Sequence, residues 1–201
     1  MSITNIVLAG VGGQGSVLAT QVLARALANA GERVVTSEVH GMSQRGGTVV
    51  TTIRFGDDAW SSVIPQGEAD YLVAFEELEA ARHLEYLRPN GIAITSDQRV
   101  QPSTEALKRS PYPADVQALA AGRCRELLEV PALAIAQELG NAKLAGTVVL
   151  GALSRYLDIP EPAWIAAIGD TVPPHTVEKN LEAFRRGAAW RRALERAVPA
   201  V

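Results

Sequence analysis

Short apolar runs alternate with one longer amphipathic segment at the start of the chain. Ile3–Ala9 is rich in β-branched residues, which is typical of a buried strand. Val17–Ala30 is rich in Ala and Leu, which favours a helix, and Gly31 is suited to end that helix. Arg33–Val39 again has the composition of a strand. The pattern predicts a strand–helix–strand unit whose two strands are parallel.

The middle of the chain continues as short apolar segments between turn residues. Further strands are predicted at Gly46–Phe55, Asp70–Phe75, Gly91–Thr95 and Glu126–Val130. Trp60–Ile64 is a candidate partner strand that ends at Pro65. Helices are predicted at Glu76–Leu87 and Asp115–Ala121, and Ser96–Pro113 gives the weakest pattern.

The last third of the chain has the pattern of helices. They are predicted at Leu133–Leu139, Lys143–Tyr156, Pro162–Ile168 and Val177–Ala197. There is no internal repeat and no low-complexity linker. We therefore predict an α/β fold, a Rossmann-like three-layer sheet with helices on both faces and a helical C-terminal third. Residues 1–201 are expected to form one domain, with the core sheet over about 1–130 and the C-terminal helices over about 131–201.

Composition and charge indicate an ordinary globular protein. The 201 residues are 47% hydrophobic and 20% charged, and the formal net charge is −3. This charge does not indicate a nucleic-acid partner, and a solvated helix face explains the locally basic segment Arg185–Arg196. No apolar stretch is long enough to span a membrane, and the N-terminus lacks the pattern of a secretory signal. A cytoplasmic location is therefore expected.

The chain holds one cysteine, Cys124. One cysteine cannot form an internal disulfide, and it cannot by itself hold an iron–sulfur cluster or a structural zinc ion. A reducing cytoplasm is consistent with this. His40 and Glu38 give only two candidate metal ligands, so no metal site is predicted. Any metal or redox centre must sit mainly on another chain.

A glycine motif follows the first predicted strand. Gly10–Gly15, with the sequence GVGGQG, satisfies G-x-G-x-x-G and opens the predicted helix. Glycines allow a sharp turn, and the N–H groups of a helix N-terminus favour an anion, usually phosphate. Glu38 lies about twenty residues further on, where a dinucleotide-binding domain has its ribose-binding acid. A dinucleotide site, a loop that only permits close packing, and a surface for another phosphate-bearing cofactor or a partner all stay open.

A second glycine-rich segment, Glu38–Gly47 (EVHGMSQRGG), ends the second predicted strand. It is not a nucleophile elbow, because Arg45 stands where G-x-S-x-G needs its second glycine, and no Walker A motif is present. Arg45 can bind phosphate or carboxylate with its forked guanidinium group, and Ser43 and Gln44 can donate and accept hydrogen bonds. The segment is either a polar hairpin or a ligand or interface loop beside Gly10–Gly15.

The two glycine-rich segments together resemble the γ-type subunits of 2-oxoacid:ferredoxin oxidoreductases, most closely those of the indolepyruvate type. The resemblance continues through Gly67–Asp70, Glu76–Arg82, Tyr112–Asp115, Leu139–Lys143, Leu150–Ala152 and Asn180–Phe184. It therefore covers nearly the whole chain, and the glycine-rich segments are its specific part. One departure is Gly146, where relatives commonly carry Asn at the start of the local helix.

The resemblance implies an oxidoreductase subunit that is not active alone. In this family an arylpyruvate such as indolepyruvate is oxidatively decarboxylated, coenzyme A accepts the acyl group, and electrons pass through iron–sulfur clusters to ferredoxin. Thiamine diphosphate with Mg²⁺ and the [4Fe–4S] clusters belong to the large partner subunit, which agrees with the single Cys124. Thiamine diphosphate supplies the electron sink. This chain is expected to complete the site and to hold its neighbours in position.

The expected site consists of cofactor contacts and one acid–base candidate. The contacts are Gly10, Gly12, Gly13, Gln14, Gly15, Ser43, Gln44, Arg45 and Gly46. His40 is the only histidine in a motif and is the acid–base candidate; the alternative is an ordinary hydrogen-bonded loop histidine. Lys143 could contact an anion or a partner, and the alternative is an ordinary surface lysine. Glu76, Glu77 and Glu79 lie at a helix start and are expected to interact with the helix dipole, and Glu76, just past a strand end, could instead face the site.

Two other classes of function stay open. A free-standing NAD(P)-dependent dehydrogenase would use Gly10–Gly15 and Glu38, although no Tyr-x-x-x-Lys pair is present. A non-catalytic binding module would use the glycine loop for packing alone.

Overall fold

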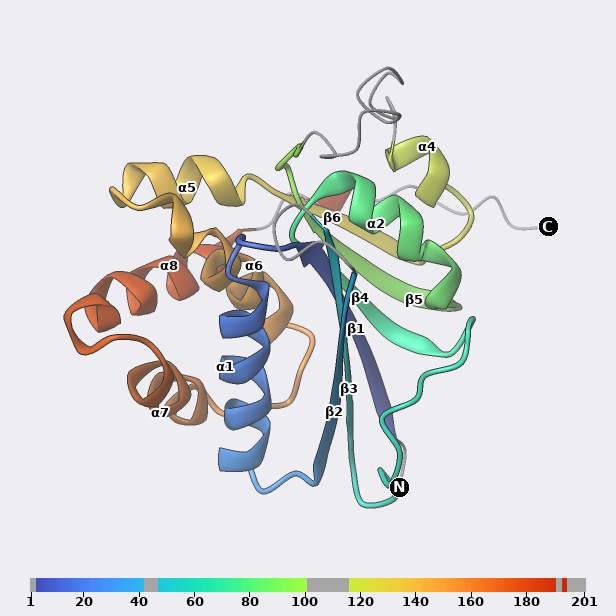
Figure 1. Ribbon diagram of the computed structural model, residues 1–201, viewed down its shortest axis with the longest axis horizontal. Coiled ribbons are helices and arrows are strands. Elements are labelled where there is room, and N and C mark those ends of the chain that lie inside the picture. Colours follow the sequence, from blue (N-terminus) through green and yellow to red (C-terminus); the bar gives the residue numbers. More distant parts are fainter. Residues whose placement is uncertain (1–2, 42–46, 101–115, 191–192, 195–201) are drawn as a thin grey trace.

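The structure is a computed structural model that describes residues 3–41, 47–100, 116–190 and 193–194 (Figure 1). A central sheet has helices on both faces, as predicted. The strands are β1 Thr4–Val11, β2 Val34–His40, β3 Thr48–Phe55, β4 Ala69–Ala74, β5 Leu87–Ser96, β6 Glu126–Val130 and β7 Ala193–Leu194. Their order across the sheet is β2-β3-β1-β4-β5-β6-β7.

The sheet is parallel in its centre and antiparallel at both sides. β1, β4, β5 and β6 are parallel neighbours, whereas β3 is antiparallel to both β1 and β2, and β7 is antiparallel to β6. The predicted unit of β1, helix and β2 therefore has two strands with the same direction. However, β3 lies between them and pairs with both. β2 consequently becomes an edge strand instead of a direct neighbour of β1.

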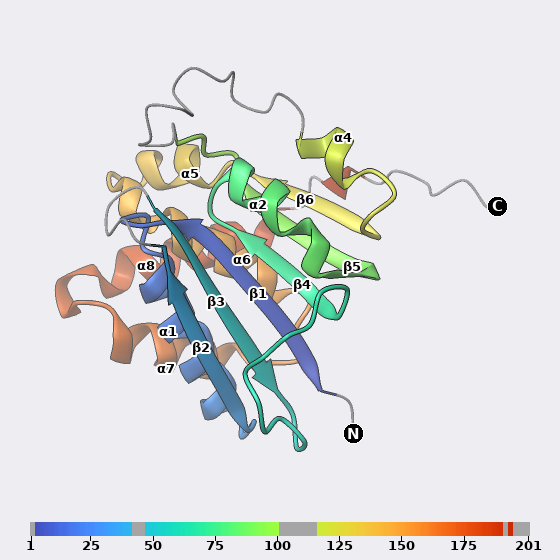
Figure 2. The ribbon, with the colours of Figure 1, turned by 45° about the vertical axis from the view of Figure 1, so that its right-hand side comes forward.

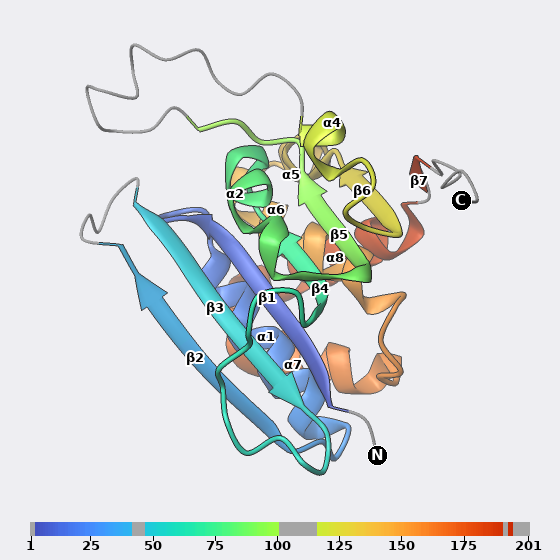
Figure 3. The same ribbon diagram turned by 90° about the vertical axis from the view of Figure 1, so that its right-hand side faces the viewer.

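The helices form two unequal layers (Figures 1 and 2). One layer contains α1 Ser16–Asn29, α5 Ala132–Glu138, α6 Ala145–Ser154, α7 Glu161–Thr171 and α8 Val177–Ala189. The opposite layer contains α2 Glu77–His83 and α4 Val116–Ala120, and it lies over β4, β5 and β6. Short 3₁₀ helices are η1 Leu84–Tyr86, η2 Ala142–Leu144 and η3 Pro174–Thr176. The layer of α2 and α4 leaves the same face of β2 and β3 without a helix (Figure 3).

The main core lies between the sheet and the larger helical layer. Ile6, Leu8 and Ile53 face it from the strands, and Trp164 and Phe184 face it from α7 and α8. The two aromatic rings pack at a centroid distance of 5.1 Å. A smaller core fills the other face, below α2 and α4. Most of the predicted elements therefore appear within a few residues of their expected bounds, because their apolar positions match these two cores.

The predicted strand at Trp60–Ile64 is wrong. This segment crosses the open face of β3 without joining the sheet. β3 already pairs with β1 and β2 and has no free edge. Side chains of β3 instead bind the carbonyl oxygens of the segment: Arg54 donates to Ser61 and Val63, and Thr52 donates to Ser62. The segment Trp60–Ile64 is therefore a loop that side chains of β3 hold by hydrogen bonds.

One predicted helix ends early, whereas another agrees with its prediction. The predicted helix Glu76–Leu87 is helical over α2 and η1, to within one residue at each end, and Leu87 begins β5. Val177–Ala197 ends at Ala189, because Trp190 turns to an extended conformation and its indole N–H donates to the carbonyl oxygen of Glu129 at 2.9 Å. The chain then reaches β6 and forms β7. Tertiary contacts with the sheet therefore override the helical pattern after Ala189.

Candidate functional site

The glycine loop lies at the carboxyl end of β1, where the following helices change from one face of the sheet to the other. α1 follows β1 on one face of the sheet, whereas α2 follows the neighbouring parallel strand β4 on the other face (Figure 1). A parallel sheet opens at such a position, because the two connections leave in opposite directions. Ligands of α/β proteins bind outside the carboxyl ends of strands at this kind of switch point.

The two glycine-rich segments meet at this position. The Gly12 N–H group donates to the carbonyl oxygen of Gly47 at 2.9 Å. The expectation that the segments are neighbours is therefore confirmed for these two residues. His40 is the last residue of β2. Its side chain, and all of the predicted contacts Ser43, Gln44, Arg45 and Gly46, lie outside the described part of the structure.

The loop leaves the N-terminus of α1 open. Gly13 and Gly15 have φ values of 102° and 81°, which residues other than glycine rarely adopt. Gly15 caps the helix without a side-chain hydrogen bond, and the Ala19 N–H is the first to bond back, to Gly15. The amides of Ser16 to Leu18 precede that bond and have no acceptor within the helix. N–H groups at such a position can bind an anion, and anion binding here stays a prediction.

Gln14 braces the loop from inside. Its Oε1 accepts from the Val11 N–H at 2.8 Å, and its Nε2 donates to the Phe75 carbonyl oxygen at 3.2 Å and to Gln98 Oε1 at 2.9 Å. The Gln14 side chain therefore connects the ends of β1 and β4 with Gln98, which follows β5. Gln14 was expected to contact a cofactor. The observed contacts instead make it a positioning residue, and ligand contact stays a prediction.

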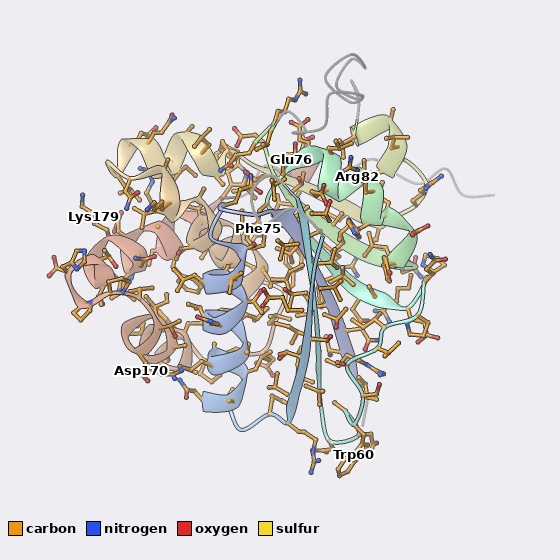
Figure 4. The ribbon with its side chains drawn as sticks, in the orientation of Figure 1. Trp60, Phe75, Glu76, Arg82, Asp170 and Lys179 are labelled. Atoms are coloured by element: carbon orange, nitrogen blue, oxygen red, sulfur yellow. The ribbon has the colours of Figure 1, made fainter. Side chains whose placement is uncertain are left out.

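Phe75 packs the loop against α6. A Cβ atom at Gly10 would lie 3.1 Å from the Phe75 ring, so glycine is needed there for close packing. A Cβ atom at Gly146 would lie 3.6 Å from the Gly15 carbonyl oxygen and 3.7 Å from Phe75, which is ordinary contact. A longer side chain at position 146 would therefore start beside the glycine loop. Figure 4 shows Phe75 and Glu76 together at this end of the sheet.

Lys143 lies beside the open helix end. Its carbonyl oxygen is 3.8 Å from the position of a Cβ atom at Gly15, and its N–H group is capped by Asn141 Oδ1 at 3.1 Å. The backbone of Lys143, in η2, therefore lies next to the N-terminus of α1. The sequence suggested an anion or partner contact or a surface lysine, and the anion contact stays a prediction.

Two buried carboxylates at the start of α2 lie next to residues that contact the glycine loop. Glu76 is 1% exposed, and its side chain accepts from the N–H groups of Glu79 and Val100, so it caps α2 instead of facing a ligand. Glu79, also 1% exposed, accepts from Arg82 at 2.6 Å and from Thr48 at 3.1 Å. The role expected for Glu79 was the helix dipole alone. Its link to the first residue of β3 had no signal in the sequence.

Glu38 is too far from the glycine loop to act as the ribose-binding acid of a dinucleotide fold. That role requires β2 next to β1. Here β3 separates them, so β2 lies two strand spacings, or about 10 Å, from β1. The prediction of an NAD(P) site therefore loses its second element, although the glycine motif itself is in place.

Cys124 is half-buried, and burial raises the pKa of its thiol. Thiolate is the reactive form, so at pH 8 we expect iodoacetamide to alkylate the folded protein about tenfold more slowly than the protein in denaturant. Mass spectrometry of quenched samples measures both rates. Equal rates would show that the folded chain does not protect this thiol.

Within the described ranges, no three His, Cys, Asp or Glu side chains are grouped so that they could hold a metal ion. No helix among these residues combines the length and the apolar run needed to cross a bilayer.

Comparisons with known proteins give the same family from sequence and from structure. The family model for pyruvate ferredoxin/flavodoxin oxidoreductase matches residues 5–190. The chain is 36% identical to the indolepyruvate oxidoreductase subunit IorB of Thermococcus kodakarensis, over 91% of this chain and 93% of the relative. It is 29% identical to the 2-oxoglutarate synthase subunit KorC of Methanocaldococcus jannaschii, over 90% and 89% of the two chains.

Solved structures share the fold. The pyruvate oxidoreductase subunit PORC of Thermotoga maritima superposes with a TM-score of 0.74 at 25% identity, over 97% of this chain and all of that one. A 2-oxoglutarate:ferredoxin oxidoreductase of Magnetococcus marinus, solved with coenzyme A bound, gives a TM-score of 0.70 at 22% identity, over 94% of this chain and 31% of that one. The chain therefore belongs to the pyruvate ferredoxin/flavodoxin oxidoreductase family.

Proposed function

We propose that this chain is the small subunit of a thiamine-diphosphate-dependent 2-oxoacid:ferredoxin oxidoreductase that acts on arylpyruvates such as indolepyruvate. Four curated indolepyruvate oxidoreductase subunits are 34–36% identical to it, whereas the 2-oxoglutarate synthase subunits are 29–30% identical. In the proposed reaction, the 2-oxoacid and coenzyme A give acyl-coenzyme A and CO₂. The two electrons released pass through iron–sulfur clusters to ferredoxin.

The redox centres fit the partner subunit better than this chain. A [4Fe–4S] cluster is held by cysteine thiolates, typically four, and this sequence has one cysteine, which is half-buried. Thiamine diphosphate, held with Mg²⁺ by the large subunit, supplies the electron sink for decarboxylation. The chain then needs the large subunit for activity and contributes binding and positioning.

The contribution of this chain is an anion-binding ledge, formed by the open amides of α1, the Gly13–Gly15 turn and Lys143. A phosphate fits this chemistry, because the amides donate, the helix dipole is favourable, and no Cβ atom stands between them and solvent at Gly13. The single observation that supports the proposed phosphate site is this helix end at the switch point between β1 and β4. The phosphate belongs to coenzyme A or to thiamine diphosphate. His40 remains the proposed acid–base residue.

The subunit assignment is tested by reconstitution. The purified chain alone should not reduce a viologen dye with indolepyruvate and coenzyme A. A mixture with the proposed large thiamine-diphosphate and iron–sulfur subunit should reduce the dye. Reduction by the chain alone, or no gain from the large subunit, would contradict the assignment.

The ledge is tested by replacing Gly13 with leucine in the reconstituted enzyme. Leucine is strained at φ 102° and covers the amides, so we expect kcat/KM to fall at least about tenfold, a loss of about 1.4 kcal/mol. Gly122→Leu is the matched control, because Gly122 has φ 77°, no neighbour within 4 Å of its Cβ position, and lies in a turn before β6.

Two titrations identify the phosphate. An increased KM for coenzyme A alone would assign the ledge to coenzyme A, and a weakened affinity for thiamine diphosphate alone would assign it to that cofactor. Equal kinetics for the Gly13 and Gly122 variants would leave the loop with a packing role only.

A further inference from the structure

Ser16, the first residue of α1, is a buried residue whose hydroxyl group has no protein partner. Its exposed fraction is 5%. Its carbonyl oxygen accepts from Thr20 Oγ1 at 3.0 Å, but its own Oγ makes no hydrogen bond to any described residue. Buried polar side chains are nearly always hydrogen-bonded, because an unmade hydrogen bond is costly. The Ser16 hydroxyl group is therefore left for water or for a ligand.

This hydroxyl group projects from the end of α1. The Cα–Cβ bonds of a helix tilt toward its N-terminus, and Ser16 has no helical turn before it. Among the described residues, the buried polar atoms that are sealed from solvent and lack a partner are Glu79 Oε2 and Trp164 Nε1. Ser16 Oγ is not one of them, so the small exposed part of Ser16 includes this oxygen. A ligand on the proposed ledge can therefore reach it.

Gln98 provides a second donor, and its neighbours decide which end of its amide is free. Gln14 Oε1 accepts from the Val11 N–H group, and Gln14 Nε2 donates to the Phe75 carbonyl oxygen. These two backbone groups fix the orientation of the Gln14 amide. The Gln98 atom at 2.9 Å from Gln14 Nε2 must then be the acceptor, Oε1. The NH₂ group of Gln98 consequently points elsewhere and has no acceptor within the described ranges.

Gln98 is held in place before any ligand binds. Its N–H group donates to Ser96 Oγ at 3.3 Å, and its carbonyl oxygen accepts from the Glu77 N–H group at 3.0 Å. Immobilising a glutamine side chain costs conformational entropy, and folding has already met this cost. The carboxylates nearby have partners: Glu77 pairs with Arg99 at 2.7 Å, and Glu76 accepts from two backbone N–H groups. They therefore repel an anion only weakly.

We propose that Ser16 and Gln98 bind a diphosphate group through their side chains, with Gln14 between them. This inference rests on the proposed function, because it adds two contacts to the same ledge. Ser16 begins the helix after β1, whereas Gln98 follows β5, and β4 separates these strands by two spacings, or about 10 Å. Two linked phosphoryl groups offer acceptor oxygens to both donors more readily than one phosphate does. Coenzyme A and thiamine diphosphate each contain such a group.

Calorimetric titration of the full chain with inorganic pyrophosphate tests the proposal. Ser16→Ala removes only the unpaired hydroxyl group, and Gln98→Glu keeps the oxygen that accepts from Gln14. We expect the Kd for pyrophosphate to rise about fivefold in the first variant and about tenfold or more in the second. The urea midpoint of Ser16→Ala should not fall, because the variant loses no internal hydrogen bond. Gln66→Glu, at an exposed position before β4, is the control for charge and should keep the original Kd.

Nuclear magnetic resonance of the unmodified chain gives a measurement that needs no variant. The side-chain NH₂ signals of Gln98 should shift when pyrophosphate is added. No shift, no binding of pyrophosphate, or binding no tighter than that of inorganic phosphate overturns the proposal. Kd values for both variants equal to that of Gln66→Glu overturn it as well, and one unimpaired variant overturns the contact of that residue.

The reconstituted enzyme identifies the source of the diphosphate. An increased KM for coenzyme A in both variants assigns the two donors to coenzyme A, and a weakened affinity for thiamine diphosphate assigns them to that cofactor. Failure of the proposed function gives a different result. The mixture with the large subunit would then not reduce the dye, whereas the chain would still bind pyrophosphate and the two variants would still bind it more weakly.

Discussion

Replacing Gly187 with alanine is expected to lower the free energy of unfolding by about 3 kcal/mol or more. α6 and α8 approach each other through two glycines. A Cβ atom at Gly187 would overlap the carbonyl oxygen of Val148, and one at Gly151 would overlap the carbonyl oxygen of Phe184. Both obstacles are backbone atoms of helices, which cannot rotate away as a side chain can. The helices would have to separate, and the buried Phe184 would lose its packing against Trp164.

Urea unfolding followed by circular dichroism measures this loss. Gly169→Ala is the matched control, because Gly169 lies within α7 and nothing lies within 4 Å of its Cβ position. Alanine is the better helix former, so the control should be unchanged or more stable by up to about 1 kcal/mol. If both variants unfold alike, the contact between α6 and α8 does not depend on the glycines.

Replacing Gln14 with leucine is expected to cost about 2–4 kcal/mol of stability and to disorder the glycine loop. Leucine has a similar size but leaves the Val11 N–H and the Phe75 carbonyl oxygen without their partner. Each buried polar group that loses its partner costs about 1–3 kcal/mol. The link from β1 and β4 to Gln98 would be lost together with these bonds.

The measurement compares stability with loop order. Gln137→Leu, at an exposed position of α5, is the control and should be nearly neutral. In the Gln14 variant, amide exchange at Gly12 and Gly13 should accelerate more than exchange in the core of β1. In the reconstituted enzyme, the KM values for phosphate-bearing ligands should rise more than kcat falls. A Gln14 variant as stable as the control would show that the three bonds contribute little.

These two predictions concern contacts between segments distant in the sequence, and such contacts could not be predicted from the pattern of residues. The motif placed Gln14 among the ligand contacts, because a G-x-G-x-x-G spacing says nothing about where an intervening side chain points. The side-chain amide of Gln14 has three protein partners because the sheet brings the end of β4, with Phe75, and the residues after β5, with Gln98, close to the end of β1. Glu79 is a similar case, since its partner Thr48 is brought near by the pairing of β3 with β1.

The sequence by itself determined most of the elements and the position of the glycine loop. Local pattern suffices there, because apolar periodicity sets strand or helix and glycine permits the turn at Gly13 and Gly15. The tertiary structure decided the order of the strands, the loss of the predicted strand at Trp60–Ile64 and the end of α8. Each depends on which edge of the sheet is free, and β-strand pairing is non-local, so neighbouring residues carry little information about it. The same pairing moved Glu38 away from β1 and put β2 at the end of the strand order among the described residues.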